Sequence, residues 1–159
     1  MAKKIAKRKT SKKFDTGIAI RRQVVGDAYV DRALAAADEL TWPMQELITE
    51  YCWGTVWARP QLTRRERSLL NLAMLTALNR PHEVKIHVRG ALNNGVSKAE
   101  IVEVFLQTCV YCGVPAAVDS IRIAQEVFAE AAAEHGGERA GAKERGDARE
   151  RGGARDRGR

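Results

Sequence analysis

The segment NRPHEVKIHVRG (79–90) contains four side chains able to bind anions or move protons. They are Arg80, Glu83, His87 and Arg89, which together span ten residues. If Pro81 begins a helix, Glu83 and His87 are four residues apart and share one face. A neighbouring carboxylate raises the pKa of an imidazole and burial lowers it, and the sequence leaves open which effect is larger. Either outcome leaves a group able to move protons near neutral pH. The plainer alternative is a buried histidine with satisfied hydrogen bonds, beside a glutamate that offsets the helix dipole.

The segment YCWGTVWARP (51–60) is a second candidate. Trp53 and Trp57 are one helical turn apart, and Arg59 follows before Pro60. Aromatic side chains at this spacing usually pack in a core. An arginine at the rim of an aromatic-lined cavity is also what an anionic small molecule would require. Alone, this segment is a weak indication of a binding site.

Thiol and metal chemistry are disfavoured by spacing. Cys109 and Cys112 form a CxxC at the end of a predicted helix, where the dipole disfavours a thiolate, so we expect two small buried residues. His82 and His87 are five residues apart and lack the HExxH spacing of a zinc site, so we expect no metal. The sequence also lacks the P-loop, GxGxxG and GxSxG motifs.

Helices must position these residues, because almost every segment has helical periodicity. The pattern predicts an all-α protein of about six helices. Capping boxes at Thr63–Glu66 and Ser97–Glu100 predict two of the helix starts, and Asn94 or Gly95 is suited to a helix stop. The expected helices cover residues 28–40, 43–58, 64–78, 81–94, 98–112 and 116–135.

The charge of the chain is concentrated at its ends. Residues 1–13 carry seven basic groups and no acid, and residues 136–159 carry eight basic and five acidic groups. Subtracting both from the totals of 27 and 20 leaves 12 basic and 15 acidic groups between them. We therefore expect disordered tails at 1–15 and 136–159 around one folded domain, 16–135. Basic tails favour solubility or weak contact with polyanions over specific nucleic-acid recognition.

A cytoplasmic location is expected from the same composition. No segment has the apolar run of a secretory signal or of a membrane span. Three cysteines are too few for a disulfide scaffold, which fits a reducing compartment.

The motifs WGTVWARP, RERSLL, HVRGALNNGVS and YCGVPAA, in this order and spacing, resemble the carboxymuconolactone decarboxylase family. The resemblance extends from about Gly17 to about Phe128. It implies an all-α homo-oligomer, commonly a trimer or hexamer, that decarboxylates without a metal or organic cofactor. The implied reaction converts 4-carboxymuconolactone to the β-ketoadipate enol-lactone in protocatechuate catabolism.

The superfamily that this resemblance implies also contains alkylhydroperoxidase-type enzymes, whose catalytic helix carries CxxCxxxH. Aligning that histidine with His87 puts Arg80 and Glu83 at the two cysteine positions. The chain therefore keeps the histidine and lacks both thiols, which disfavours thiol peroxidase activity.

Roles for the candidate residues follow from this resemblance. We expect His87 to protonate or stabilise a dienolate, with Glu83 orienting it. The expected substrate-binding residues are of two kinds. Three arginines could bind the anionic groups, and three further side chains could line the binding site or add a polar contact: Arg80, Arg59 and Arg89, and Trp57, Tyr111 and Glu103. Arg89, two residues from His87, is on another helix face and could instead serve a subunit interface.

Three alternatives remain open at this point. A related acidic lactone could be the substrate, because family membership constrains the scaffold better than the substrate. A thiol peroxidase would use Cys109 and Cys112. A nucleic-acid-associated protein would act through its tails.

Overall fold

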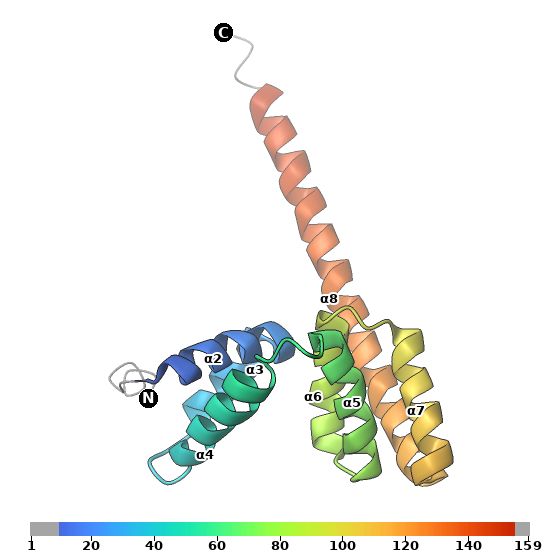
Figure 1. Ribbon diagram of the computed structural model, residues 1–159. Coiled ribbons are helices and arrows are strands. Elements are labelled where there is room, and N and C mark those ends of the chain that lie inside the picture. The colour runs from blue at the N-terminus through green and yellow to red at the C-terminus, as the bar shows by residue number, and fades with distance from the viewer. Residues whose placement is uncertain (1–9, 155–159) are drawn as a thin grey trace. The chain divides into compact units, whose positions relative to one another are not determined.

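In the computed structural model, residues 10–154 are described, with side chains described from residue 10 to residue 134. This part of the chain is helical and contains no strand (Figure 1). Its elements, in chain order, are α2 (Lys12–Val25), α3 (Asp27–Ala36), α4 (Trp42–Leu47), the π-helix η1 (Ile48–Val56), α5 (Arg64–Ala77), α6 (Pro81–Asn93), α7 (Lys98–Cys112) and α8 (Val114–Ala154). The prediction of an all-α fold is confirmed.

Both ends of the chain differ from the sequence prediction. Helix α2 was not predicted, and it begins at Lys12, inside the segment expected to be a disordered tail. Ser11 caps it by accepting a hydrogen bond from the backbone N–H of Phe14. Helix α8 continues to Ala154, across most of the segment expected to be disordered. Residues 1–9 and 155–159 lie outside the described residues.

The chain divides into two compact units after Ala124. The first unit contains α2 to α7 and the beginning of α8, and the second contains the rest of α8. Among the described residues, no helix has the length and apolarity needed to span a bilayer. The expected cytoplasmic location and the absence of a nucleic-acid partner stay predictions.

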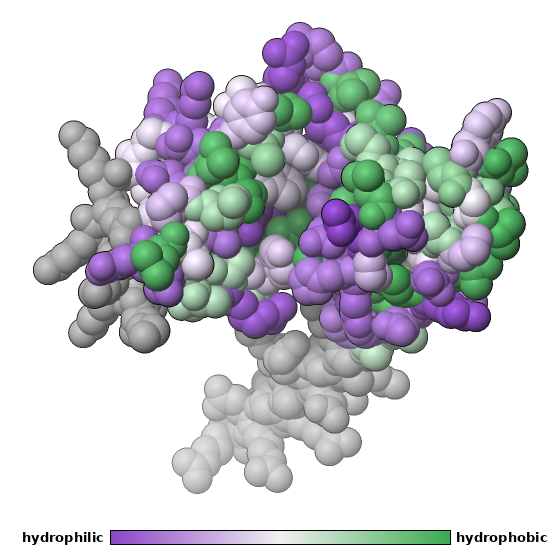
Figure 2. Space-filling view, turned by 90° about the horizontal axis from the view of Figure 1, so that it is seen from below, coloured by the Kyte–Doolittle hydropathy of each residue, from purple (hydrophilic) through white to green (hydrophobic). Residues whose placement is uncertain are grey.

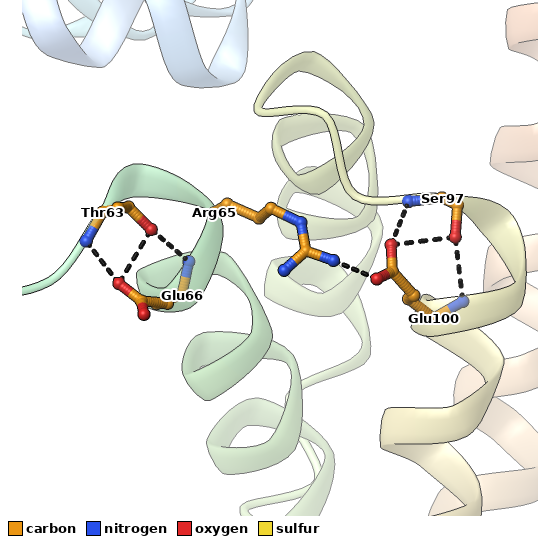
Figure 3. A network of polar contacts seen from close by, with 5 residues as sticks. All are labelled: Thr63, Arg65, Glu66, Ser97 and Glu100. Carbon is orange, nitrogen blue, oxygen red and sulfur yellow. Dashed lines mark hydrogen bonds and ion pairs between the residues drawn. The ribbon is translucent and has the colours of Figure 1, made fainter.

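Both predicted capping boxes are present (Figure 3). The hydroxyl of Thr63 accepts from the N–H of Glu66 at 3.2 Å, and the Glu66 carboxylate accepts from the N–H of Thr63 at 2.6 Å. Ser97 and Glu100 repeat the arrangement at 3.2 and 2.9 Å. Arg65 forms an ion pair with Glu100, so the start of α5 is joined to the start of α7. These caps fix where α5 begins, and α5 packs against α6 and α7.

The helix predicted over 28–40 ends earlier, at Ala36. The carboxylate of Asp38 accepts hydrogen bonds from the backbone N–H groups of Leu40 and Thr41 at 3.0 and 2.8 Å. This local turn satisfies the backbone outside a helix. Leu40, the last residue of the predicted helix, is therefore exposed.

Two glycines bring the backbones of α2 and η1 into contact. A Cβ atom on Gly17 would lie 2.0 Å from the carbonyl oxygen of Thr49, and one on Gly54 would lie 2.2 Å from that of Lys13. No side chain fits at either position. The surrounding core is apolar and includes Phe14, Val24, Val30, Leu34, Trp42 and Trp53.

Helix α6 lies against α2 at a third glycine. A Cβ atom on Gly90 would lie 3.1 Å from the side chain of Val24, and the Asn93 side chain donates to the Val24 carbonyl at 2.8 Å. Between α5 and α6, Asn79 adopts a left-handed conformation with φ of 53°, which Asn tolerates better than most residues, and Pro81 then occupies the first turn. These contacts orient the face of α6 that carries His87.

Gly17→Ala is expected to lower the free energy of unfolding by about 2 kcal/mol or more, because α2 must move away from η1 to admit the methyl group. Urea denaturation measures the change. Ala19→Ser, at an exposed position of the same helix, is the matched control and should change stability by less than about 0.5 kcal/mol. Equal stabilities of Gly17→Ala and the wild type would contradict the close packing.

Candidate active site

A cavity of about 450 Å³ lies in the first unit among α2, α3, η1, α5 and α6. Its size is typical of small-molecule sites, which span roughly 300–1,000 Å³. The apolar lining residues are Val25, Ile48, Trp53, Val56, Trp57 and Ile86. The polar lining residues are Arg21, Tyr29, Cys52, Asn71, Glu83 and His87.

His87 occupies the aromatic side of this cavity. Its ring is nearly parallel to that of Trp53, with centroids 6.4 Å apart and an interplanar angle of 5°. Trp57 is at a similar distance, 6.5 Å, and its ring is tilted by 30°. Asn71 on α5 places its side-chain amide nitrogen 3.5 Å from Nδ1 of His87. Donation from that nitrogen favours the tautomer with its hydrogen on Nε2.

Burial decides the protonation state of His87. It lowers the pKa of the imidazole below its ordinary value, because the charged form loses its hydration, and the Glu83 carboxylate opposes the shift only in part. Burial is therefore the larger of the two effects on the pKa of His87 that the sequence left open. His87 is a neutral imidazole at neutral pH in the free protein.

The π-helix η1 presents much of the cavity wall. It contributes Ile48, Cys52, Trp53 and Val56, and Trp57 follows directly as its C-cap. The N–H of Trp57 donates to the carbonyl of Cys52 at 2.8 Å, five residues back. This wider turn is rare and is often found at functional sites.

Arg21 is a functional candidate that sequence reasoning missed. Its side chain is only 4% exposed and lines the cavity. Nη1 donates to Oε1 of Gln45 at 3.0 Å and to Oγ1 of Thr49 at 3.3 Å, and the guanidinium carbon lies 6.0 Å from the centre of the Tyr29 ring. Burial lowers the pKa of this guanidinium below its ordinary value. Arg21 shares the buried face of α2 with apolar residues, and a charged residue at such a position is the signal that could have identified it.

Three of the predicted site residues come together in this cavity: His87, Glu83 and Trp57. The other five do not line it. Arg59 and Arg80 are exposed at helix ends, and Arg89, which has partners of its own, lies two residues from His87 on another face of α6. Glu103 and Tyr111 are exposed on α7, Tyr111 by 77%, and α7 contributes no lining residue. Their assignment as substrate contacts stays a prediction.

The cysteines of the CxxC lie apart from the cavity. Cys109 is half-buried, Cys112 is exposed, and both are free thiols. The expectation that both are buried is therefore wrong for Cys112, which follows from its place in the last turn of α7, next to the chain reversal at Gly113. Within residues 10–134, no three His, Cys, Asp or Glu side chains form a group suited to a metal ion.

The family model and the two relatives to which the chain is similar all bear the name of a decarboxylase. A model of the carboxymuconolactone decarboxylase family matches residues 43–126. Nitrosuccinic acid decarboxylase npaB of Metarhizium robertsii is 47% identical over 115 residues, which cover 72% of this chain and 80% of that protein. The 4-carboxymuconolactone decarboxylase of Acinetobacter baylyi is 38% identical over 116 residues, covering 73% and 87%.

An NMR titration of the His87 ring should give a pKa below the ordinary value of about 6.5. Glu83→Gln should lower it further, because the carboxylate favours the charged imidazole. Spectra of His87→Gln assign the resonance. A wild-type pKa above 6.5, or a pKa that rises in Glu83→Gln, would contradict the electrostatic account.

Proposed function

Because the chain belongs to the carboxymuconolactone decarboxylase family and is a carboxy-lyase, we propose that it decarboxylates 4-carboxymuconolactone to the β-ketoadipate enol-lactone. The observation that supports this proposal is the cavity in which His87, beside Glu83, faces the rings of Trp53 and Trp57. The reaction would belong to protocatechuate catabolism. It requires a site that holds an anion and stabilises a developing enolate.

The substrate supplies its own electron sink. The carboxylate that leaves is bonded to a ring carbon next to a C=C that is conjugated with the lactone carbonyl. When the C–C bond to CO2 breaks, its electron pair moves through the C=C to the carbonyl oxygen and forms a dienolate. A proton added to carbon then gives the enol-lactone. The protein must stabilise negative charge on the oxygen and deliver that proton.

His87 performs both tasks in this proposal. In the free protein it is neutral, and the tautomer favoured by Asn71 carries an Nε2–H that can donate a hydrogen bond to a bound substrate. As the electron pair moves to the carbonyl oxygen, the developing negative charge favours the imidazolium, so His87 takes up a proton from solvent as the enolate forms and not as an ion pair with the departing carboxylate. The imidazolium then stabilises the enolate and transfers its proton to carbon, while the Glu83 carboxylate favours its charged form.

Nitrosuccinate is a second candidate substrate, favoured by the 47% identity to the decarboxylase of Metarhizium robertsii. It is a dicarboxylate whose nitro group is next to one carboxylate. Loss of that carboxylate as CO2 moves the electron pair onto the nitro oxygens as a nitronate. The demands on the protein are the same: an anchored carboxylate, a donor to a developing oxyanion and a proton for carbon.

A direct assay distinguishes the two substrates. The purified protein, without added metal or cofactor, is given freshly prepared 4-carboxymuconolactone or nitrosuccinate, and CO2 release and product are measured. We expect turnover of 4-carboxymuconolactone with the higher kcat/KM. A higher kcat/KM for nitrosuccinate would make nitrosuccinate the substrate and would leave the proposed decarboxylation mechanism in place. Inactivity with both compounds would refute the proposal.

His87→Gln should lower kcat by about 100-fold or more, since one residue provides the acid and the oxyanion donor. His82→Gln is the matched control, because His82 is exposed on the same helix and does not line the cavity. Circular dichroism checks that both variants are folded. Near-normal kcat in His87→Gln would remove His87 from the mechanism.

We also propose that the chain forms a homo-trimer or homo-hexamer. This is supported by exposed apolar side chains at helical spacing on α5 and its C-cap (Leu70, Met74 and Leu78) and on α7 (Leu106 and Val110). Apolar side chains reach the surface beside hydrophilic ones in Figure 2. Light scattering should give three or six times the chain mass of 17.6 kDa, and a monomer at micromolar concentration would contradict this proposal.

A further inference from the structure

We infer that Arg21 binds the carboxylate that the substrate retains, and that the departing carboxylate lies on the aromatic side of the cavity, against Trp53 and Trp57. This inference rests on the proposed function and specifies how a dicarboxylate is held. Arg21 and the two tryptophans line the same cavity. The assignment of the two carboxylates follows from the partners of Arg21 and from the change in charge during the reaction.

The partners of Arg21 leave its charge uncompensated. Both hydrogen bonds from Nη1 go to neutral oxygens, those of Gln45 and Thr49. Within the described part of the chain, Arg21 forms no ion pair with a carboxylate. Its neighbour Arg22 differs, since it contacts Asp27 at 2.9 Å and Asp31 at 2.6 Å. A buried cation without a counter-ion is costly, and an anion entering the cavity would offset that cost.

The guanidinium is also held in place for such an anion. Gln45 and Thr49 are one turn apart and bind the same nitrogen, Nη1, so Nε and Nη2 take no part in these two bonds. Thr49 is fully buried. The ring of Tyr29 lies over the guanidinium at 6.0 Å. A planar guanidinium fixed in this way suits the two oxygens of a carboxylate.

The reaction decides which carboxylate Arg21 binds. The retained carboxylate keeps its charge from substrate to product, so an ion pair with it is equally strong throughout. The departing carboxylate becomes neutral CO2, and an ion pair there would stabilise the ground state more than the transition state and slow the reaction. Arg21 therefore contributes to binding and orientation at the end of the substrate that does not react.

The aromatic side of the cavity suits the departing group. Trp53 and Trp57 are buried, and their rings lie 4.7 Å apart beside His87. A carboxylate loses hydration against these rings, whereas neutral CO2 does not depend on it. The carboxylate of Glu83, on the same side, adds repulsion that ends when CO2 leaves. Both effects favour the transition state over the bound substrate.

The test compares Arg21→Gln with Arg22→Gln, which removes a charge from the same helix outside the cavity. Each variant is assayed on the dicarboxylate that the wild type decarboxylates and on the analogue in which a methyl group replaces the CH2–COO⁻ arm. For nitrosuccinate this analogue is 2-nitropropanoate. The comparison separates binding of the retained carboxylate from every other role of Arg21.

For the dicarboxylate, Arg21→Gln should raise KM by about 10- to 100-fold and change kcat by less than about threefold, as expected for lost uniform binding. For the methyl analogue, the variant and the wild type should have equal kcat/KM. Arg22→Gln should match the wild type on both. An equal loss on both compounds, or a fall in kcat with unchanged KM, would overturn the inference.

A binding measurement keeps the inference testable if neither substrate is turned over or if Arg21→Gln does not fold. Propionate is titrated against propionamide while the fluorescence of the cavity tryptophans is followed, in the wild type and in Arg21→Lys. Propionate should bind the wild type at least tenfold more tightly than propionamide, and Arg21→Lys should reduce that ratio because lysine cannot bind a carboxylate through two N–H groups. Equal affinities for the acid and the amide in the wild type would overturn the inference without bearing on catalysis.

Discussion

The contact between the backbones of α2 and η1 at Gly17 and Gly54 is the constraint on which the site depends. Thr49 takes part twice, because its carbonyl oxygen lies against Gly17 and its hydroxyl accepts from Arg21, one turn further along α2. A side chain at Gly17 would separate these helices and withdraw both acceptors from the guanidinium. The same packing holds Trp53 and Trp57 in the core, where they line the same cavity as Arg21.

This arrangement produces a cavity lined by a cation, Arg21, and by a neutral imidazole, His87, that lies beside indole rings and the Glu83 carboxylate. Arg21 provides a fixed cation whose hydrogen-bonding partners are neutral. His87, packed beside indole rings, is kept neutral by burial until the enolate forms. A substrate that carries its own electron sink needs little more than these two groups, because the protein only has to orient it, stabilise an oxyanion and return a proton. The proposed function and the proposed role of Arg21 therefore both depend on this placement of the Arg21 cation and the neutral His87 in one cavity.

Local signals in the sequence predicted the second half of the first unit well. The capping boxes, Pro81 and the helix stop at Asn94 or Gly95 act within a few residues, so α5, α6 and α7 begin and end close to the predicted positions. His87, Glu83 and Trp57 were found by spacing and family resemblance. Arg21 was missed because α2 was not predicted and because its partners are 24 and 28 residues away. The π-helix and the exposure of Tyr111 likewise depend on tertiary packing, which spacing does not contain.

The most direct measurement is a crystal structure of the protein with a non-reactive dicarboxylate, such as succinate, bound at saturating concentration. The account predicts that one carboxylate is within hydrogen-bond distance of the Arg21 guanidinium and that the other end of the ligand lies beside Trp53 and His87. A ligand bound through the exposed arginines, with Arg21 keeping only its contacts to Gln45, Thr49 and Tyr29 as in the free protein, would contradict it.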